Sequence, residues 1–388
     1  MSQVRVAGVG LTHFGVHPER TTREMFGEAG NTALEDAGID RDEIESVFYG
    51  NFMGELSEHQ GHSGPLAAEA IGVDAPATRY ESACASSGAA IREAVKNIRS
   101  GEADVVVTGG AERMNNLPTA ETTEALAIAA DDLYEVRAGM TFPGAYALMA
   151  DAYFDEYGGS REDLAHIAVK NHENAVDNEY AQFQSEISVE KAMDAPPVAT
   201  PVHLFDACPI TDGAAAAVLV SDSYAEAHDI EAPVAVTGTG QGSDKLALQD
   251  REFLVRTPAS EKAGEEAYED AGIEPSDVDF AEVHDCFTIA EVLAIEALGL
   301  FEHGKGITGA RNGLTTRDGP MPINLSGGLK AKGHPVGATG ASQLVEVVKL
   351  FEGNHPNSEY VEDSSIGLIH NAGGTVASTT VHVMEVVE

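Results

Sequence analysis

The sequence predicts an α/β fold in which two similar halves pack helices against sheets in layers. Three observations support this: a repeated helix, repeated glycine-bearing strands, and one long insertion. Segments 28–39 and 262–273 agree at most positions and lie 234 residues apart. Each copy is a helical pattern that stops at a glycine, as helices do when the residue after the last turn is left-handed. Buried β-branched strands in both halves favour helices stacked on sheets.

The strands repeat as well. The opening strand at 4–10 carries a Gly-x-Gly pattern that returns at 234–240. In each half the repeated helix is followed by a short acidic turn and then a strand, at 46–51 and at 279–284. We therefore expect both halves to begin with the same strand, helix and strand.

A third match concerns two further helices. A helical pattern opens after Cys84 and ends near Gly101, and a buried strand follows at 103–110. Aligning 85–90 with 337–342 places Gly88 on Gly340, and Cys84 then falls two residues after the position of His334. A pseudo-twofold relation between the halves would bring the Cys84 and His334 loops face to face.

The first half is interrupted by an insertion at about 115–205, before its last strand at 213–221. An excursion this long from a compact core is usually functional, often as a lid or substrate-binding part. We predict an N-terminal half at 1–222, which includes the insertion, and a C-terminal half at 223–388.

Charge is the strongest feature of the composition. The chain has 64 acidic and 23 basic residues, a formal net charge of −41. The acids are spread along helix faces and apolar periodic segments run throughout, so this is not an acidic disordered tail. Such a surface is typical of a halophilic protein, because concentrated salt screens the self-repulsion. Nucleic acid is not expected as a partner.

Three cysteines, Cys84, Cys208 and Cys286, are too few for a disulfide framework and indicate a reducing compartment. No apolar run reaches the length of a membrane span, and the first residues are typical of a strand and not of a signal peptide. We expect a cytoplasmic protein with no membrane partner.

Cys84 stands among small residues at a predicted helix N-terminus, where the macrodipole and free N–H groups favour the thiolate. A buried structural cysteine is the alternative from position alone. Other segments add polar groups: His284 and Cys286 lie at a strand-to-helix junction, and His334 lies in a glycine-rich loop stiffened by Pro335. Cys208 is expected to be structural.

These segments resemble the thiolase superfamily over essentially the whole chain. The matching features are the cysteine opening the central helix, the strand end 105–112, the run 212–216, and the loop 328–340, which is the most specific of them. The motif His-Asp-Cys-Phe at 284–287 is similar to that of sterol carrier protein-type and archaeal thiolases; most thiolases have Asn-Glu-Ala-Phe there. With the acidic surface, this indicates a haloarchaeal member. The resemblance implies an α-β-α-β-α layered fold with an inserted loop domain that binds coenzyme A.

The family also implies residue roles. Cys84 would be acylated by the acyl-CoA substrate. His334 would activate Cys84 and, with a water held by His284, form an oxyanion hole for the thioester enolate. The preorganised donors are needed because a proton next to a thioester is only weakly acidic.

The chain departs from most thiolases near its C-terminus. They carry a second cysteine there, in a Cys-x-Gly motif, as the acid/base. Here the corresponding run 369–374 has none, and the His-Asp-Cys-Phe motif makes Cys286 the acid/base candidate. His370 and Asn371 are further possible site residues, with His370 open between the site and the core.

Coenzyme A is implied as substrate and product, with no tightly bound cofactor. It is a polyanion, so its contacts should be positive side chains, helix N-termini or close backbone. Gly337, Gly373 and Lys332 are the candidates for these contacts, and Lys330 and residues of the insertion are weaker ones. The sequence has no metal-binding spacing such as C-x-x-C or H-E-x-x-H, so no metal is predicted.

We therefore expect a transferase, an acetyl-CoA C-acetyltransferase that interconverts two acetyl-CoA with acetoacetyl-CoA and CoA through an acyl-Cys84 intermediate. Ping-pong kinetics would follow. Alternatives are a degradative 3-ketoacyl-CoA thiolase for longer chains, a decarboxylating condensing enzyme, and a non-catalytic thiolase-like scaffold or lipid-binding protein. Thiolases are homodimers or homotetramers. Archaeal relatives can also join HMG-CoA synthase through a zinc-ribbon/OB-fold bridging protein, which would place the chain in the lipid metabolism of isoprenoids and mevalonate.

Overall fold

A computed structural model describes residues 3–387 of the chain. Its helices are α1 (Thr22–Ala37), α2 (Gly54–Ser57), α3 (Ser63–Ala70), α4 (Ser86–Ser100), α5 (Thr119–Ala127), α6 (Phe142–Tyr157), α7 (Arg161–Ala175), α8 (Val189–Met193), α9 (Asp222–His228), α10 (Pro258–Ala271), α11 (Thr288–Ala297), α12 (Gly328–Ala331) and α13 (Thr339–Phe351). Its strands are β1 (Val4–Leu11), β2 (Ser46–Gly50), β3 (Ala77–Tyr80), β4 (Val105–Glu112), β5 (Pro197–Ala199), β6 (Val202–His203), β7 (Gly213–Ser221), β8 (Val234–Ser243), β9 (Phe280–Glu282), β10 (Ile366–Gly373) and β11 (Ser378–Val386).

Nine strands form one mixed sheet in the order β3-β2-β4-β7-β1-β8-β11-β10-β9. The first half of the chain supplies the part from β3 to β1, and the second half supplies the part from β8 to β9. The two parts are joined by the pairs Val4↔Val236 and Arg5↔Ala235. The division at residues 222/223, where β7 has ended, remains our prediction for the domain boundary.

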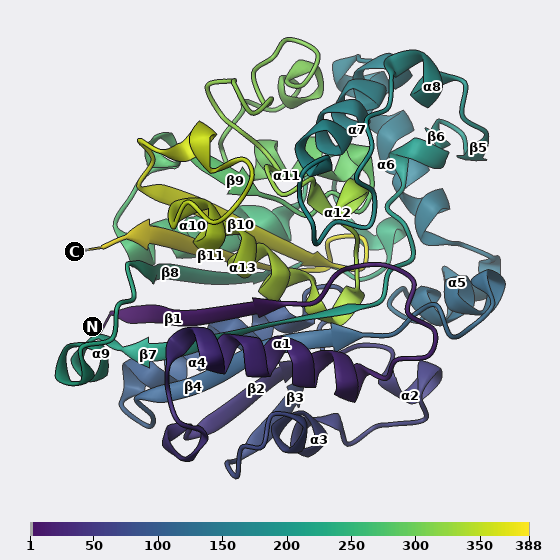
Figure 1. Cartoon of the computed structure of the whole chain (residues 1–388). Helices are drawn as coiled ribbons and strands as arrows, with labels where there is room; N and C mark the ends of the chain where they lie inside the picture. Colours follow the sequence, from purple (N-terminus) through teal and green to yellow (C-terminus); the bar gives the residue numbers. More distant parts are fainter. Residues whose placement is uncertain (1–2, 388) are drawn as a thin grey trace.

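Helices cover these two parts in layers (Figure 1). Helices α1 and α3 pack on the outer face of the first part, and α10 and α11 on the outer face of the second. Helices α4 and α13 lie between the two parts and contact strands of both. Strand β4 shows the alternation that this requires, since Val106 faces the central layer while Val105 and Val107 face α1. The predicted fold class, with its α-β-α-β-α order, is confirmed.

Close packing explains the repeated Gly-x-Gly strands. A Cβ atom added to Gly10 would lie 2.0 Å from the carbonyl oxygen of Ala29, and one added to Gly240 would lie 1.9 Å from that of Ala263. Helices α1 and α10 therefore rest directly on the backbones of β1 and β8, and no side chain fits between them.

The central helices meet at the aligned glycines. A Cβ atom added to Gly340 would lie 2.6 Å from the backbone nitrogen of Gly88. The first turns of α4 and α13 are therefore in backbone contact, and the loops that precede them converge. This is the arrangement expected from the repeat, and it places Cys84 and His334 on the same side of the molecule.

The insertion forms α5 to α8 and the β5–β6 hairpin. It lies at the end of the molecule opposite to the start of β1 and the end of β11 (Figure 1). Helix α6 shares an apolar cluster with Phe287 and Leu329, so the insertion packs against the segments that carry the second-half site residues. Within residues 3–387, none of the helices is both long enough and apolar enough to span a membrane.

Candidate active site

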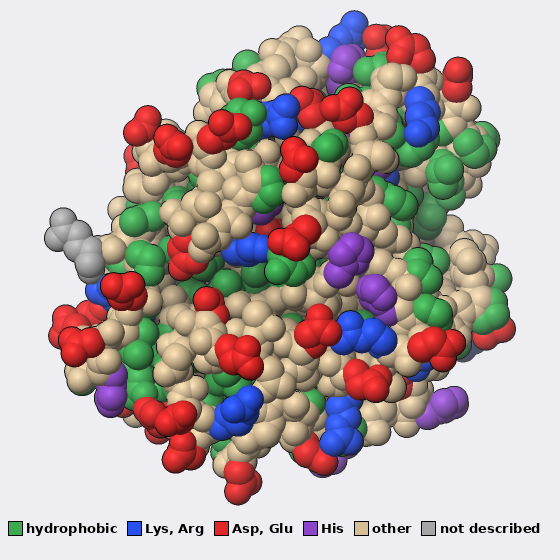
Figure 2. Space-filling view, in the orientation of Figure 1, with side chains coloured by type: hydrophobic (Ala, Val, Ile, Leu, Met, Phe, Trp, Pro, Cys, Tyr) green, Lys and Arg blue, Asp and Glu red, His purple; other side chains and the backbone are tan. Residues whose placement is uncertain are grey.

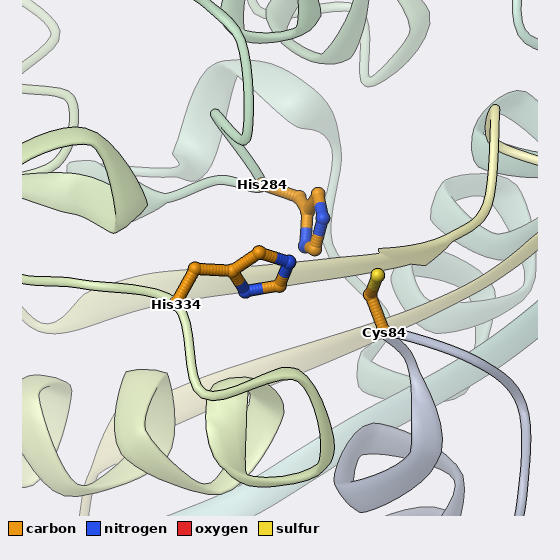
Figure 3. A group of neighbouring side chains, drawn as sticks. All are labelled: Cys84, His284 and His334. Carbon is orange, nitrogen blue, oxygen red and sulfur yellow. The ribbon is translucent and has the colours of Figure 1, made fainter. Parts of the chain in front are cut away.

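Three side chains from distant parts of the chain converge on one point (Figure 3). Cys84 precedes α4, His284 follows β9, and His334 lies between α12 and α13. The sulfur of Cys84 and one ring nitrogen of each histidine lie within 4.8 Å of one another. The two imidazole rings meet edge to face, with centroids 5.0 Å apart. Ala83 adopts a left-handed φ of 49°, so the turn that presents Cys84 is locally strained.

The hydrogen bonds of His334 define its role. Its Nδ1 lies 2.7 Å from Thr339 Oγ1, and the Thr339 hydroxyl donates to the carbonyl oxygen of Pro335 at 3.0 Å. Because that hydroxyl has only one proton, Thr339 Oγ1 accepts from His334 Nδ1–H. Burial lowers the pKa of His334 to about 3, so the ring is neutral. Its Nε2 is then a free base that points toward Cys84 and His284 (Figure 3).

His284 has the opposite tautomer. The side-chain amide nitrogen of Asn371 donates to the Cys84 carbonyl oxygen at 3.0 Å and lies 3.2 Å from His284 Nδ1. Since that amide nitrogen carries only protons, His284 Nδ1 accepts and Nε2 holds the ring proton. Burial lowers the pKa of His284 well below its usual value, with His334 contributing, so the ring is neutral. Its buried Nε2–H has no hydrogen-bond partner within the described residues and is available to a ligand.

The Nε2–H tautomer of His284 also disfavours a metal ion at this site. Cys84, His284 and His334 are residue types that hold soft metal ions. A metal ligand must offer a lone pair, and His284 offers an N–H group to the site instead. The hydrogen bonds therefore favour a catalytic reading of this group over a metal centre.

The thiol of Cys84 differs from the sequence expectation. Burial raises its pKa to about 12, and the carboxylate of Glu112 adds to this, although the backbone N–H groups of Gly374 and of Cys84 itself act in the opposite direction. The helix N-terminus therefore does not by itself produce a thiolate. Deprotonation must be coupled to a base, and the free Nε2 of His334 is the base in place. The N–H groups of Cys84 and Gly374 remain as a pair of donors around the sulfur.

All three cysteines line one apolar cavity. Its polar and thiol groups come from Cys84, Cys208, Cys286, His334, Thr123 and Tyr146. Its apolar walls come from both halves and from the insertion, including Phe52, Met114, Leu126, Phe142, Ile210 and Phe287. The backbone N–H of Cys208 donates to the Cys286 carbonyl oxygen at 3.0 Å. Cys208 was expected to be structural, but the structure places it in the cavity wall beside Cys286.

His370 lies behind the site. Its Nδ1 accepts from the backbone N–H of His284 at 3.3 Å, and its Nε2 lies 2.9 Å from Ser260 Oγ. Both ring nitrogens are thus engaged, the side chain is buried, and His370 is not part of the cavity wall. The structure gives it a supporting position under His284, with no free nitrogen for proton transfer.

The candidate coenzyme A contacts are distributed differently from the expectation. The predicted contact of Lys332 with coenzyme A is wrong. Its side chain is 1% exposed and its amino group faces Glu346 at 3.7 Å, so it cannot reach a phosphate. Gly337 is also buried, where its N–H donates to Glu112. Gly373 lies at a second, more open hollow next to the cavity, and Gly374 lines both.

Sequence reasoning missed two buried site residues. The carboxylate of Glu112, at the end of β4, accepts from Asn51 Nδ2 and from the N–H groups of Phe52, Met53 and Gly337, at 2.8 to 3.1 Å. It thereby ties the His334 loop to the first half, and only its place at a glycine-rich strand end hinted at this. Tyr146, in the cavity wall, gave no signal because it lies in the insertion, far from every motif.

A cysteine facing a neutral imidazole base, with a second thiol and unpaired N–H donors in one cavity, defines a thiol-dependent acyltransferase. Comparison with known proteins makes the class specific. Residues 4–223 match the N-terminal domain of thiolase and residues 240–386 match a thiolase C-terminal domain-like family. The chain therefore belongs to the thiolase family.

Individual relatives cover the whole chain. It is 41% identical to an acetyl-CoA acetyltransferase of Methanothermobacter thermautotrophicus, over 99% of each chain. It is 35% identical to a benzoylsuccinyl-CoA thiolase subunit of Thauera aromatica, over 96% of this chain and 95% of that one. Bovine sterol carrier protein 2 is 33% identical over 96% of this chain and 70% of its own length. A solved Ltp2-ChsH2(DUF35) aldolase shares the fold, with a TM-score of 0.85, 24% identity and coverage of 99% and 98%.

Proposed function

We propose that this thiolase is an acetyl-CoA C-acetyltransferase that reversibly condenses two acetyl-CoA into acetoacetyl-CoA and CoA. The observation that carries the proposal is the arrangement of Cys84 opposite the free Nε2 of His334, with Cys286 in the same cavity. The similarity to two archaeal acetyl-CoA acetyltransferases, at 41% and 39% identity over nearly full length, supports the substrate.

In the first half-reaction the Cys84 sulfur attacks the thioester carbonyl of acetyl-CoA, and its proton passes to His334 Nε2. The N–H groups of Cys84 and Gly374 hold the oxyanion of the tetrahedral intermediate. Collapse of the intermediate breaks the bond to the CoA sulfur, which takes the proton from His334. The products are acetyl-Cys84 and free CoA.

In the second half-reaction Cys286 passes its proton to His334 Nε2, and the resulting thiolate removes a methyl proton from a second acetyl-CoA. The enolate oxygen accepts from the protonated Nε2 of His334 and from a water that the Nε2–H of His284 binds. The enolate carbon attacks acetyl-Cys84 and releases the Cys84 thiolate. That sulfur takes the proton from His334, while Cys286 keeps the methyl proton as a thiol, which restores all three groups and leaves acetoacetyl-CoA.

The test is to mix purified protein in molar KCl with acetoacetyl-CoA and CoA and to follow the 3-ketothioester. We expect its loss with release of acetyl-CoA. Folded protein with a free Cys84 thiol that gives no loss would contradict the proposal. The apolar cavity walls also suit longer 3-ketoacyl chains, so a series of chain lengths separates the biosynthetic from the degradative enzyme.

The cellular setting extends the proposal. Coenzyme A acts as substrate and product and not as a bound cofactor. The net charge of −41 supports a haloarchaeal, salt-rich cytoplasm, and Figure 2 shows acidic side chains over one whole face with fewer basic ones among them. We further propose a homodimer or homotetramer, and association with HMG-CoA synthase through a zinc-ribbon/OB-fold protein in isoprenoid synthesis. Co-purification from native extract in high salt tests this; recovery of the thiolase alone would count against it.

A further inference from the structure

One tyrosine of the insertion reaches the reacting groups. Tyr146 lies on α6, is 1% exposed, and lines the cavity that holds Cys84 and Cys286. Its ring stacks on Phe287, with centroids 4.6 Å apart and an interplanar angle of 26°. Because Phe287 follows Cys286 directly in the chain, this stacking fixes the tyrosine against the segment that carries the second thiol.

The hydroxyl of Tyr146 has two neighbours but one proton. It donates to the Gly374 carbonyl oxygen at 3.1 Å, and the Cys286 thiol, which lines the same cavity, is close enough to interact with it. While Cys286 is a thiol, its S–H can donate to the Tyr146 oxygen, and the Tyr146 O–H continues to donate to the Gly374 carbonyl oxygen. Once Cys286 is a thiolate, the sulfur is the stronger acceptor, because hydrogen bonds to ionised groups are about twice as strong as neutral ones.

The surroundings of Cys286 otherwise oppose ionisation. Burial raises the pKa of this thiol well above its usual value, and the nearby Cys208, Cys84 and Asp285 act in the same direction. The buried amino group of Lys330 interacts with Cys208 and Asp285 and is not among the main influences on Cys286. Among the main influences on the Cys286 pKa, the Tyr146 hydroxyl is the one that favours the thiolate.

We propose that Tyr146 is a positioning residue that makes Cys286 an effective base by turning its O–H from the Gly374 carbonyl oxygen to the Cys286 sulfur when the thiol loses its proton. This inference rests on the proposed acid/base role of Cys286. It assigns the insertion a direct part in proton transfer, in addition to forming the cavity wall.

The ionisation of Cys286 can be measured without turnover. In a chain with Cys84→Ala and Cys208→Ala, Cys286 is the sole thiol, since the chain has three cysteines. Its alkylation by iodoacetamide is followed against pH in molar KCl. Tyr146→Phe should raise the midpoint of this pH profile, the pH at which alkylation reaches half its maximal rate, by about one unit. At pH values below the midpoint, alkylation of the variant should then be about tenfold slower. An unchanged midpoint would overturn the inference.

Helix α6 offers a matched control. Tyr153 is also buried, and its hydroxyl donates to Glu296 at 2.5 Å, away from the cavity. Tyr153→Phe should leave the Cys286 midpoint unchanged. A ring-fluorinated tyrosine at position 146, whose hydroxyl is a stronger donor, should lower the midpoint, which keeps the test decisive if the phenylalanine variant folds poorly. A midpoint that does not move with fluorination would also overturn the inference.

A second readout separates this inference from the proposed function. With the native cysteines, Tyr146→Phe should slow exchange of the acetyl-CoA methyl protons with D₂O about tenfold, in line with the shifted ionisation. A shifted midpoint with normal exchange would support the hydrogen bond to Cys286 while removing Cys286 from the acid/base role. Exchange slowed with no shift in midpoint would instead overturn the inference about Tyr146 and leave the role of Cys286 intact.

Discussion

Asn371 provides the sharpest test of the hydrogen-bond assignments at the site. Its amide nitrogen has two protons, one for the Cys84 carbonyl oxygen and one for His284 Nδ1. Asn371→Asp would replace this donor with a carboxylate that can only accept. His284 would then carry its proton on Nδ1, and Nε2 would offer a lone pair where the enolate needs a donor.

The size of the effect follows from what is lost. Removing one oxyanion donor typically lowers kcat by about a hundredfold to a thousandfold. We expect a loss of at least about a hundredfold in the exchange of acetyl-CoA methyl protons for Asn371→Asp. Asn371→Ala removes the amide donor that fixes the His284 tautomer but does not favour the opposite tautomer. We therefore expect about a tenfold loss of exchange rate, equivalent to one ordinary hydrogen bond.

The assay is proton exchange in D₂O, measured together with single-turnover acetylation of Cys84 as a control for an intact nucleophile. The order of activities should be wild type, then the alanine variant, then the aspartate variant. An aspartate variant as active as the alanine variant, with Cys84 acetylated normally in both, would refute the assigned tautomer of His284.

Further predictions concern the cysteine thiols, the hydrogen bonds of Glu112 and the effect of salt. Cys84→Ala should abolish both directions, while Cys286→Ser should keep acetylation of Cys84 and lose condensation; full activity of the serine variant in the acetoacetyl-CoA assay would move the acid/base role elsewhere. Alkylation of Cys84, with the other cysteines replaced, should rise about tenfold per pH unit up to pH 9, because burial holds its pKa near 12; a plateau below pH 8 would contradict this. Glu112→Gln should cost about 3 kcal/mol of unfolding free energy in denaturant titrations and slow acetylation, because an amide NH₂ would face backbone donors; unchanged stability would show that the four hydrogen bonds contribute little. Finally, the melting temperature should rise from low to molar KCl as the net charge of −41 is screened, and a melting temperature independent of salt would contradict the halophilic proposal.

Local sequence determined a large share of the fold. Glycine stops, Gly-x-Gly strands and valine runs identify helices and strands by periodicity and backbone freedom, which are properties of neighbouring residues. The repeat added the relation between halves, and the contact of Gly88 with Gly340 is its direct consequence. The convergence of Cys84 and His334 was therefore predictable, because equivalent loops of related halves end up on the same side.

Tertiary structure decided what a linear pattern cannot contain. The tautomers of His284 and His334 depend on Asn371 and Thr339, and only the first of these partners lies far from its histidine in the chain. Lys332 looked like a phosphate ligand beside the catalytic loop, yet burial against Glu346 makes it part of the core.

The ionisation of the thiols was also beyond the sequence. A helix N-terminus suggests a thiolate at Cys84, but its pKa is set by how much water the assembled cavity excludes, and the walls of that cavity come from both halves and from the insertion. The role proposed for Tyr146 also depends on contacts between segments that are far apart in the chain. The types of the reactive residues and their spacing can be seen in the sequence. Their burial, tautomers and hydrogen-bond partners are set only when distant segments come together in the folded protein.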